Sequence, residues 1–276
     1  MAARQLGTFT DESGLATVVT FMSEAGSEQD LFNDFAAEVP DDFVVIGGGV
    51  EGARLPLGAL LTASYPNTEL SAWLGSAKAH QQSSPFKIKV WATGLKIKGM
   101  SKDDLRGCIH ITSTTSSIGL TPEATATTPQ GNVLISGGFH VNYFGGGGNL
   151  ATASFPQNAF AWKAKSKAHF VVNDAEITSH GISIKENLPI GKRVEVFIKS
   201  VGSASAVHPS ASADLPPGYA MTGGGGDIHW QHPGCLLWRL YPLIETTNQE
   251  FTASGKAHFG PTTATVTAYA MGIKLV

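Results

Sequence analysis

The sequence of 276 residues predicts an all-β protein of three tandem repeats of about 88 residues, which we expect to form a pseudo-threefold β-prism. The first observation is a short apolar stretch that runs into glycine and occurs three times. It reads "FVVIGGG" at 43–49, "NVLISGGF" at 132–139 and "YAMTGGGG" at 219–226. Second, an aromatic-proline pair lies 18 residues beyond Gly47, Gly137 and Gly223. Third, the tripeptide Lys-Ala-His occurs once in each repeat, at 78–80, 167–169 and 256–258.

The repeats account for essentially the whole chain, so we expect a single domain spanning 1–276. Repeat one covers 1–100, repeat two 101–188 and repeat three 189–276. The anchor glycines are separated by 90 and then 86 residues. The aromatic-proline pairs are Tyr65-Pro66, Phe155-Pro156 and Tyr241-Pro242, and the aromatics that follow them are Trp73, Trp162 and Phe251.

Each repeat is predicted to contain short strands separated by turn residues. In repeat two the expected strands are Cys108–Thr115, Asn132–Val141, Asn149–Ser154, Phe160–Phe170 and Ala175–Lys185. The stretches "GLTPEATATTPQG" and "GSASAVHPSASADLPPG" are predicted to be loops because they are rich in proline, serine and threonine. Gln29–Ala37 is predicted to form at most one short helical turn.

Side chains alternate between the two faces of a strand, which assigns the residues of the Lys-Ala-His strand. In repeat two, Trp162, Ala164, Ser166, Ala168 and Phe170 share the face that we expect to pack inward. Lys163, Lys165, Lys167 and His169 share the opposite face. The other two repeats follow the same pattern, so Lys-Ala-His is predicted to direct its lysine and histidine away from the core.

The simplest assembly of three such units is three sheets around one shared core. A propeller of three blades would be unusually small, and three independent domains would need linkers that the sequence does not contain. The unit opens on "PPGYAMTGG" (Pro216 to Gly224) and closes on Thr-Ala-x-x-x-Gly-Ile-Lys-Leu (Thr267 to Leu275). These two ends resemble the repeat of vitelline membrane outer layer protein I, although this chain lacks the cysteines of that family. The resemblance implies a three-sheet β-prism linked to carbohydrate recognition.

Composition and charge exclude several functions. Charged residues make up 15% of the chain and the net charge is −3, so no basic surface for nucleic acid is expected. The N-terminal sequence lacks an apolar secretory stretch, and no apolar run is long enough for a transmembrane helix. We therefore expect cytoplasmic synthesis, with release by a non-classical route left open. Cys108 and Cys235 are expected to be buried free thiols.

The glycine runs are interpreted as structural. A nucleotide-binding fingerprint requires a helix directly after the glycines, and here proline and further apolar strands follow. Glycine in a strand permits a kink or the close approach of another backbone. We therefore expect the runs to mark corners of the prism.

The Lys-Ala-His tripeptides have three interpretations. In the first, Lys78, Lys167 and Lys256 protect strand edges from intermolecular pairing, and His80, His169 and His258 form local hydrogen bonds. In the second, each lysine–histidine pair belongs to a ligand or anion site. In the third, the three histidines converge on the prism axis and bind a metal ion.

The segments between the glycines and the aromatic-proline pairs keep their length but not their content. They read "VEGARLPLGA", "HVNYFGGGGN" and "GDIHWQHPGC", which is the layout of a recognition surface: variable loops on a constant frame. The candidate ligand-binding residues are Asn142, Tyr143, Asp227, His229, Trp230 and His232. An aromatic ring beside Asn or Asp suits sugar binding, because the ring covers the apolar face of a pyranose. Alternatively, Tyr143 and Trp230 cap the core, and Asp227 with His229-x-x-His232 holds a divalent ion.

The leading functional expectation is a non-enzymatic, lectin-like glycan-binding protein with up to three related sites. We expect no catalytic residues, no cofactor and no bound metal, because the sequence triplicates one pattern and contains none of the common nucleophile or zinc-protease motifs. The expected partners are glycans or glycoconjugates. The alternatives are a membrane-acting toxin or defence protein, in which Thr112–Thr128 and Ser200–Leu215 rearrange, and a coat protein that self-assembles through its Lys-Ala-His faces.

Overall fold

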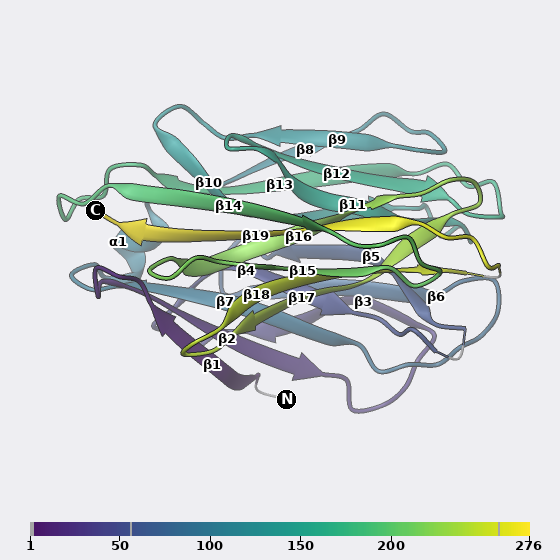
Figure 1. Cartoon of the computed structure of the whole chain (residues 1–276), viewed down its shortest axis with the longest axis horizontal. Coiled ribbons are helices and arrows are strands. Elements are labelled where there is room, and N and C mark those ends of the chain that lie inside the picture. The colour runs from purple at the N-terminus through teal and green to yellow at the C-terminus, as the bar shows by residue number, and fades with distance from the viewer. Residues whose placement is uncertain (1–2, 56, 259) are drawn as a thin grey trace.

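The computed structural model describes residues 3–55, 57–258 and 260–276, and shows an all-β chain arranged as three sheets (Figure 1). The first sheet contains, in spatial order, β1 (Arg4–Thr10), β2 (Ala16–Glu24), β7 (Lys89–Ile97), β4 (Val44–Glu51), β17 (Cys235–Ile244), β18 (Gln249–Ala257) and β15 (Ser210–Asp214). The second contains β3 (Leu31–Glu38), β6 (Ala72–Ala79), β5 (Ala59–Pro66), β10 (Asn132–Asn142), β13 (Glu176–Lys185) and β8 (Ile109–Thr115). The third contains β14 (Val194–Gly202), β19 (Thr265–Leu275), β16 (Ala220–His229), β11 (Asn149–Asn158), β12 (Ala161–Ala168) and β9 (Glu123–Thr127).

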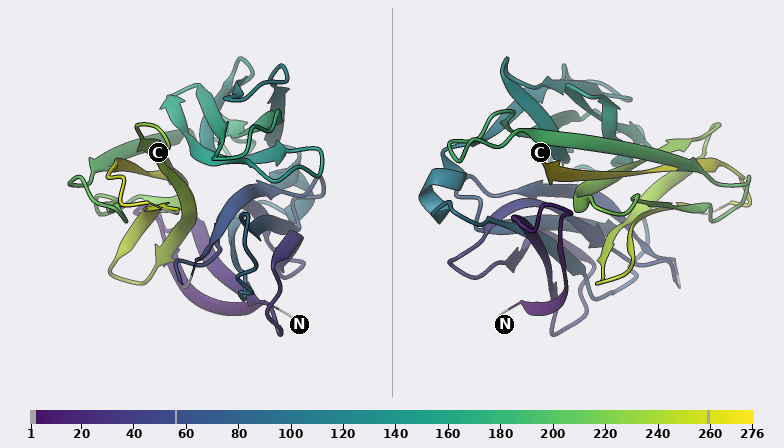
Figure 2. Two further views of the ribbon diagram at one scale, coloured as in Figure 1. Left: turned by 90° about the vertical axis from the view of Figure 1, so that its right-hand side faces the viewer. Right: turned by 60° about the vertical axis from the view of Figure 1, so that its left-hand side comes forward.

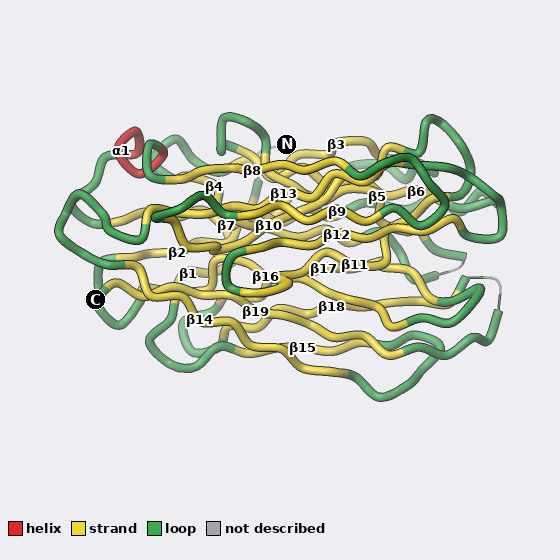
Figure 3. Tube along the Cα trace, turned by 90° about the horizontal axis from the view of Figure 1, so that it is seen from above, coloured by secondary structure: helices red, strands yellow, loops and turns green. Residues whose placement is uncertain are grey.

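Every sheet combines strands from two of the segments 1–100, 101–188 and 189–276. The junctions are β5 against β10, β11 against β16 and β17 against β4, all antiparallel. Each junction therefore joins the hairpin of one segment to the glycine-containing strand of another, and the three junctions form a closed cycle. Figure 2 shows the sheets surrounding a common interior, and Figure 3 shows most of the strands running along the long axis. Buried side chains from all three sheets form one continuous hydrophobic core.

The hairpins β5–β6, β11–β12 and β17–β18 place one large aromatic residue each in the core. Trp73 pairs in register with Pro66, Trp162 with Pro156 and Phe251 with Pro242, and all three aromatics are buried. Each strand β5, β11 and β17 also contains a bulge, at which one extra residue interrupts the pairing. The bulged residues are Thr62, Thr152 and Trp238.

The glycine runs lie inside strands β4, β10 and β16, and strand rather than helix continues through them. A Cβ atom added to Gly48, Gly137 or Gly224 would come within 3.0 Å of the ring of Trp73, Trp162 or Phe251. Glycine is thus required because the core aromatics pack directly on the backbone. The predicted close approach of another backbone is confirmed at Gly49, Gly138 and Gly225, where an added Cβ atom would lie within 2.2 Å of a carbonyl oxygen of another segment. The predicted corner is replaced by a continuous strand with a bulge just before or within the run.

Several predictions of local structure are wrong. The two Ser/Thr-rich stretches expected as loops contain the strands β9 and β15, and Gln29–Ala37 contributes to strand β3 instead of a helical turn. The helix α1 (Lys102–Arg106) was not predicted; Ser101 caps it by accepting a hydrogen bond from the backbone N–H of Asp104. The buried free thiols of Cys108 and Cys235 are confirmed.

The assignment of strand faces holds for the first half of the Lys-Ala-His strand and fails at its end. Trp162 and Ala164 are buried, and Lys163 and Lys165 are only partly exposed. Lys167 and His169 face away from the core, as expected, but are only 2% and 1% exposed, whereas Phe170, expected in the core, is 49% exposed. The reason is that the loop 230–234 of another segment covers the outer face of the strand at this point.

Candidate functional site

The strands β6, β12 and β18 end in a buried group of six side chains, which we call the lysine–histidine cluster. Its members are Lys78, His80, Lys167, His169, Lys256 and His258. All six side chains are at most 7% exposed. We call this end of the molecule the loop end, because the loop residues 52–55, 57–58, 143–148 and 230–234 cover the cluster. The opposite end carries α1 (Figure 1).

The three histidines form a closed ring of contacts. Nε2 of His80 lies 2.7 Å from the carbonyl oxygen of His169, Nε2 of His169 lies 3.3 Å from that of His258, and Nε2 of His258 lies 3.0 Å from that of His80. The centres of the imidazole rings are 5.2 to 5.9 Å apart. Each histidine therefore ties its own strand to the next segment.

The three lysines hold the covering loops in the same cyclic order. Lys78 Nζ donates to the carbonyl oxygen of Gly146 at 2.9 Å, Lys167 Nζ to that of Pro233, and Lys256 Nζ to those of Arg54 and Leu57. The Nδ1 atoms of the three histidines face the same loops, at the carbonyl oxygens of Gly147, Pro233 and Leu57. Backbone carbonyls, rather than carboxylates, thus receive the buried ammonium groups.

Burial shifts the ionisation of the whole cluster toward the neutral forms. It lowers the pKa of each of the three lysines to about 8. Burial and the neighbouring lysines also lower the pKa of His169 to about 3 and that of His258 to about 4, and burial lowers that of His80. A neutral imidazole donates from only one nitrogen, so each ring satisfies one of its two carbonyl contacts as a donor.

The predicted interpretations of Lys-Ala-His can now be compared with this geometry. The histidines do converge, but their Nε2 atoms are directed at backbone carbonyls, and among the described residues no group of three metal-ligating side chains could hold a metal ion. The strands β6, β12 and β18 are flanked on both sides, so the lysines do not protect sheet edges. The histidines are hydrogen-bonded, but to backbone carbonyl groups of other segments rather than locally. Since the six side chains are buried, they face the covering loops rather than solvent.

The loop residues predicted to bind ligand lie around the cluster but do not all meet. Tyr143 and Trp230 are half-buried against the core; Lys78 Nζ lies 3.8 Å from the ring centre of Tyr143, and Lys167 Nζ lies 4.5 Å from that of Trp230. Both rings therefore do cap the core, as the alternative interpretation predicted. Asn142 is exposed, and its Oδ1 accepts a hydrogen bond from the backbone N–H of Phe144.

The Asp-x-His-x-x-His group of repeat three is dispersed. The Asp227 carboxylate is buried and pairs with Lys165 at 3.3 Å, and His229 Nε2 contacts the hydroxyl of Thr267 at 3.0 Å. His232 instead lies at the surface beside Trp230. The alternative of a divalent ion held by these three side chains therefore has no geometric support.

Trp230 and His232 line a surface pocket of about 310 Å³ at the loop end, which we call the Trp230 pocket. Its other walls are formed by Leu120, Thr121, Ala168, Phe170, Val171 and Val172. Thr121 and Phe170 were not predicted, because the sequence assigned the first to a loop and the second to the core. The feature that could have identified Phe170 is its position directly after Lys-Ala-His, where the strand ends.

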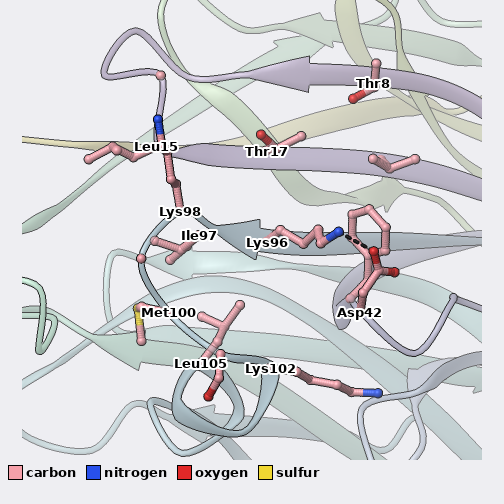
Figure 4. A pocket seen from close by; sticks show the side chains of 15 residues that line it. Thr8, Leu15, Thr17, Asp42, Lys96, Ile97, Lys98, Met100, Lys102 and Leu105 are labelled. Carbon is pink, nitrogen blue, oxygen red and sulfur yellow. Dashed lines mark hydrogen bonds and ion pairs between the residues drawn. The ribbon is translucent and has the colours of Figure 1, made fainter.

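Two larger pockets lie nearer the helix end. One, of about 590 Å³, is lined by Leu15, Phe43, Met100 and Leu105 among others, and Lys96 pairs there with Asp42 (Figure 4). The other, of about 640 Å³, lies beside Tyr65, Arg106 and His180. Neither contains a residue predicted to bind ligand.

None of the described helices is long and apolar enough to cross a membrane. The sequence matches no protein-family model, and no curated protein matches it significantly.

Proposed function

We propose that the chain is a non-enzymatic, lectin-like protein that binds glycans at the loop end of a three-sided β-prism. The prism is supported by the recurrence of the same contacts in three segments: aromatic on glycine, lysine on loop carbonyl, and histidine on the next histidine. The Trp230 pocket carries the functional part of the proposal. It combines a half-buried indole with the polar side chains of Thr121 and His232 on an exposed surface.

The chemistry of the pocket suits a saccharide. An indole face packs against the C–H groups of a pyranose. The same pocket contains the hydroxyl of Thr121 and the imidazole of His232, which can hydrogen-bond the hydroxyl groups of the sugar. Lys167 Nζ contacts one face of the Trp230 ring, so the ring is already oriented before a ligand arrives. Such a preformed but shallow site is expected to bind weakly, and presentation on a multivalent surface raises avidity by roughly 10²–10⁴.

Glycan-array binding by the wild-type protein tests the proposal. Trp230→Ala should remove the binding, and circular dichroism should show that the variant is still folded. Phe160→Ala is the matched control, because Phe160 is an exposed aromatic residue (59%) outside the pocket. Binding that survives Trp230→Ala, or no binding to any glycan, would refute the proposed site.

A second candidate function is attachment to a membrane surface, and the apolar border of the same pocket favours it. Leu120, Phe170, Val171 and Val172 are all at least 44% exposed. Exposed apolar patches of this kind mark interaction sites, and a lipid surface is one such partner. Co-sedimentation with liposomes and dye release from them test this function; Val172→Asp should abolish sedimentation if it is correct.

The third alternative was self-assembly through the Lys-Ala-His faces. Those lysines and histidines are buried beneath the loops, so they are not accessible to a second molecule. We therefore do not extend the proposal to a coat protein.

A further inference from the structure

A second pocket at the loop end differs in chemistry from the Trp230 pocket. It has a volume of about 380 Å³ and is lined by Arg54, His208, Ser210, Trp238, Arg239 and Ser254. The loop after β4, the start of β15 with the segment before it, and both strands of the hairpin β17–β18 contribute. It shares no residue with the Trp230 pocket.

The pocket is electropositive. Arg54 is exposed and makes no ion pair with any residue that the structure describes, and Lys256 Nζ is hydrogen-bonded to its carbonyl oxygen. The Arg239 guanidinium pairs with Glu51 at 2.9 Å, but Glu51 is shared with Lys89. The positive charges also act on His208: burial lowers its pKa, and so do the charges of Lys256 and Arg54.

One wall of the pocket is an indole that the other two hairpins lack. The bulge of β17 holds Trp238, whereas the corresponding bulges of β5 and β11 hold Thr62 and Thr152. These threonines are buried, but Trp238 is half-exposed. The next residue differs as well: it is Arg239 in β17, and the buried Ala63 or Ala153 in the other two strands.

A bulge is a place where a strand can redirect a side chain without disturbing its neighbours. Replacement of a small buried Thr-Ala pair by a half-exposed Trp-Arg pair adds a flat apolar surface and a cation at one point of the outer surface. The Arg239 guanidinium lies 4.4 Å from the ring centre of Tyr241 and 6.0 Å from that of Trp238, so its plane is held beside aromatic rings. Ser210 and Ser254, which share a hydrogen bond of 2.8 Å, add hydroxyl groups to the lining.

We infer that this pocket binds a saccharide carrying a carboxylate, with Trp238 under the sugar ring and Arg54 and Arg239 around the acidic group. Arginine suits this task because its planar group donates two parallel hydrogen bonds to a carboxylate. The choice of a sugar as ligand rests on the proposed function, whereas the preference for an anion rests on the arginines of this pocket alone.

The test compares glucuronate with glucose, two sugars that differ by the carboxylate, in titrations of the full chain followed by NMR shifts of the tryptophan indole N–H signals. Glucuronate should bind and shift the Trp238 signal, and glucose should bind at least about 10-fold more weakly. Arg54→Ala should weaken glucuronate binding at least about 10-fold. The double variant Trp238→Thr with Arg239→Ala, which installs the residue types of the other two hairpins, should weaken it by at least as much. Arg193→Ala removes the same charge near the C-terminus and should leave binding unchanged.

Three results would overturn the inference: no binding of glucuronate, a shift of the Trp238 signal by glucose with equal affinity, or binding of inorganic sulfate as tight as that of glucuronate, since the ring would then contribute nothing. Trp230→Ala separates this inference from the proposed function. That variant should lose neutral glycans and keep glucuronate, so a protein that binds no neutral glycan but still binds glucuronate refutes the first site only.

Discussion

The hairpins β5–β6 and β11–β12 differ from β17–β18 at four positions that matter for packing and exposure, and the differences are of two kinds. In the first two hairpins the core aromatic is tryptophan, and its Nε1–H donates to a serine hydroxyl at 2.9 Å: Trp73 to Ser64 and Trp162 to Ser154. In the third the aromatic is Phe251, which has no N–H, and Leu240 stands where the serine would be. This inner difference is compensated, because donor and acceptor are both absent.

The outer difference is compensated only in part. Arg239 pairs with Glu51, but Trp238 and Arg239, which replace a buried threonine and a buried alanine, both remain accessible at the surface of a pocket. A change that preserves the hydrogen-bond balance of the core serves stability. Side chains that remain accessible at a pocket are instead available for binding. The comparison therefore separates two groups of residues. Those with the same role in all three hairpins, such as the core aromatics and the lysine–histidine cluster, form what we call the frame, and those that differ at the surface give each face its own chemistry.

The largest effect should come from what the three hairpins share. His169→Ala removes a buried ring and leaves the carbonyl oxygen of His258 without its contact, so we expect a loss of about 3 kcal/mol in the free energy of unfolding. His80→Ala should cost a similar amount if the hairpins are equivalent. The control His232→Ala, at an exposed position, should change stability by less than about 0.5 kcal/mol in urea unfolding. A cost for His169→Ala as small as that of the control would show that the histidine ring is not part of the frame.

Acid should weaken the same shared part of the molecule. The folded-state pKa values of His169 and His258, about 3 and 4, lie below the unfolded value near 6.5, and burial also lowers that of His180 to about 4. The unfolded chain therefore takes up protons first, and stability should fall as the pH drops from 6.5 to about 4. Lys78, Lys167 and Lys256, which face the imidazoles, stay protonated throughout this window and add to the effect.

Urea unfolding at pH 7, 6, 5 and 4 measures this dependence. The loss of stability between pH 6.5 and 4 should become smaller in His169→Ala than in the wild type. A stability that is flat across this range would contradict burial of neutral histidines.

A double-mutant cycle tests whether the inner difference is a compensated pair. Trp162→Phe alone loses a hydrogen bond and some packing, and Ser154→Leu alone forces a larger side chain against the indole, so each should cost about 1–3 kcal/mol. The double variant reproduces the pair found in β17–β18, and it should recover at least about 1 kcal/mol relative to the sum. Strict additivity of the two costs, measured by guanidinium unfolding, would show that the third hairpin is not a repacked version of the other two.

The frame was largely predictable from spacing because it depends on contacts that recur. The 18-residue interval from glycine to the aromatic-proline pair identified the hairpins, and the alternation along Trp162 and Ala164 identified their inner face. Strand β9 could also have been predicted. Its Ala124 and Ala126 are buried while Glu123 and Thr127 are exposed, but small residues give a weak hydrophobic pattern.

The candidate sites were less predictable because they depend on contacts between segments. Alternation predicted that Lys167 faces away from its own core, and this is true, but only the fold shows that the loop 230–234 covers it. Trp230 and His232 were found from loop composition, whereas Trp238 and Arg239 were missed. Their signal was present in the sequence as the departure of "LLWRLYP" from "LLTASYP" and "LATASFP". Residues shared by the three repeats predict the common fold, whereas this pocket is formed by residues at which the third repeat differs from the other two.

The smallest effect on stability should come from the outer difference. Trp238→Thr installs the residue found at the other two bulges and removes a side chain that packs only partly against Leu60, Leu150 and Leu236. We expect its free energy of unfolding to stay within about 1 kcal/mol of the wild type, because the remaining surface of the indole is already in contact with water. A loss of about 2 kcal/mol or more in urea unfolding, as large as that of a buried core residue, would mean that Trp238 belongs to the frame. The contrast between the compensated inner difference and the accessible outer difference would then fail at the position where it has the most consequence for binding.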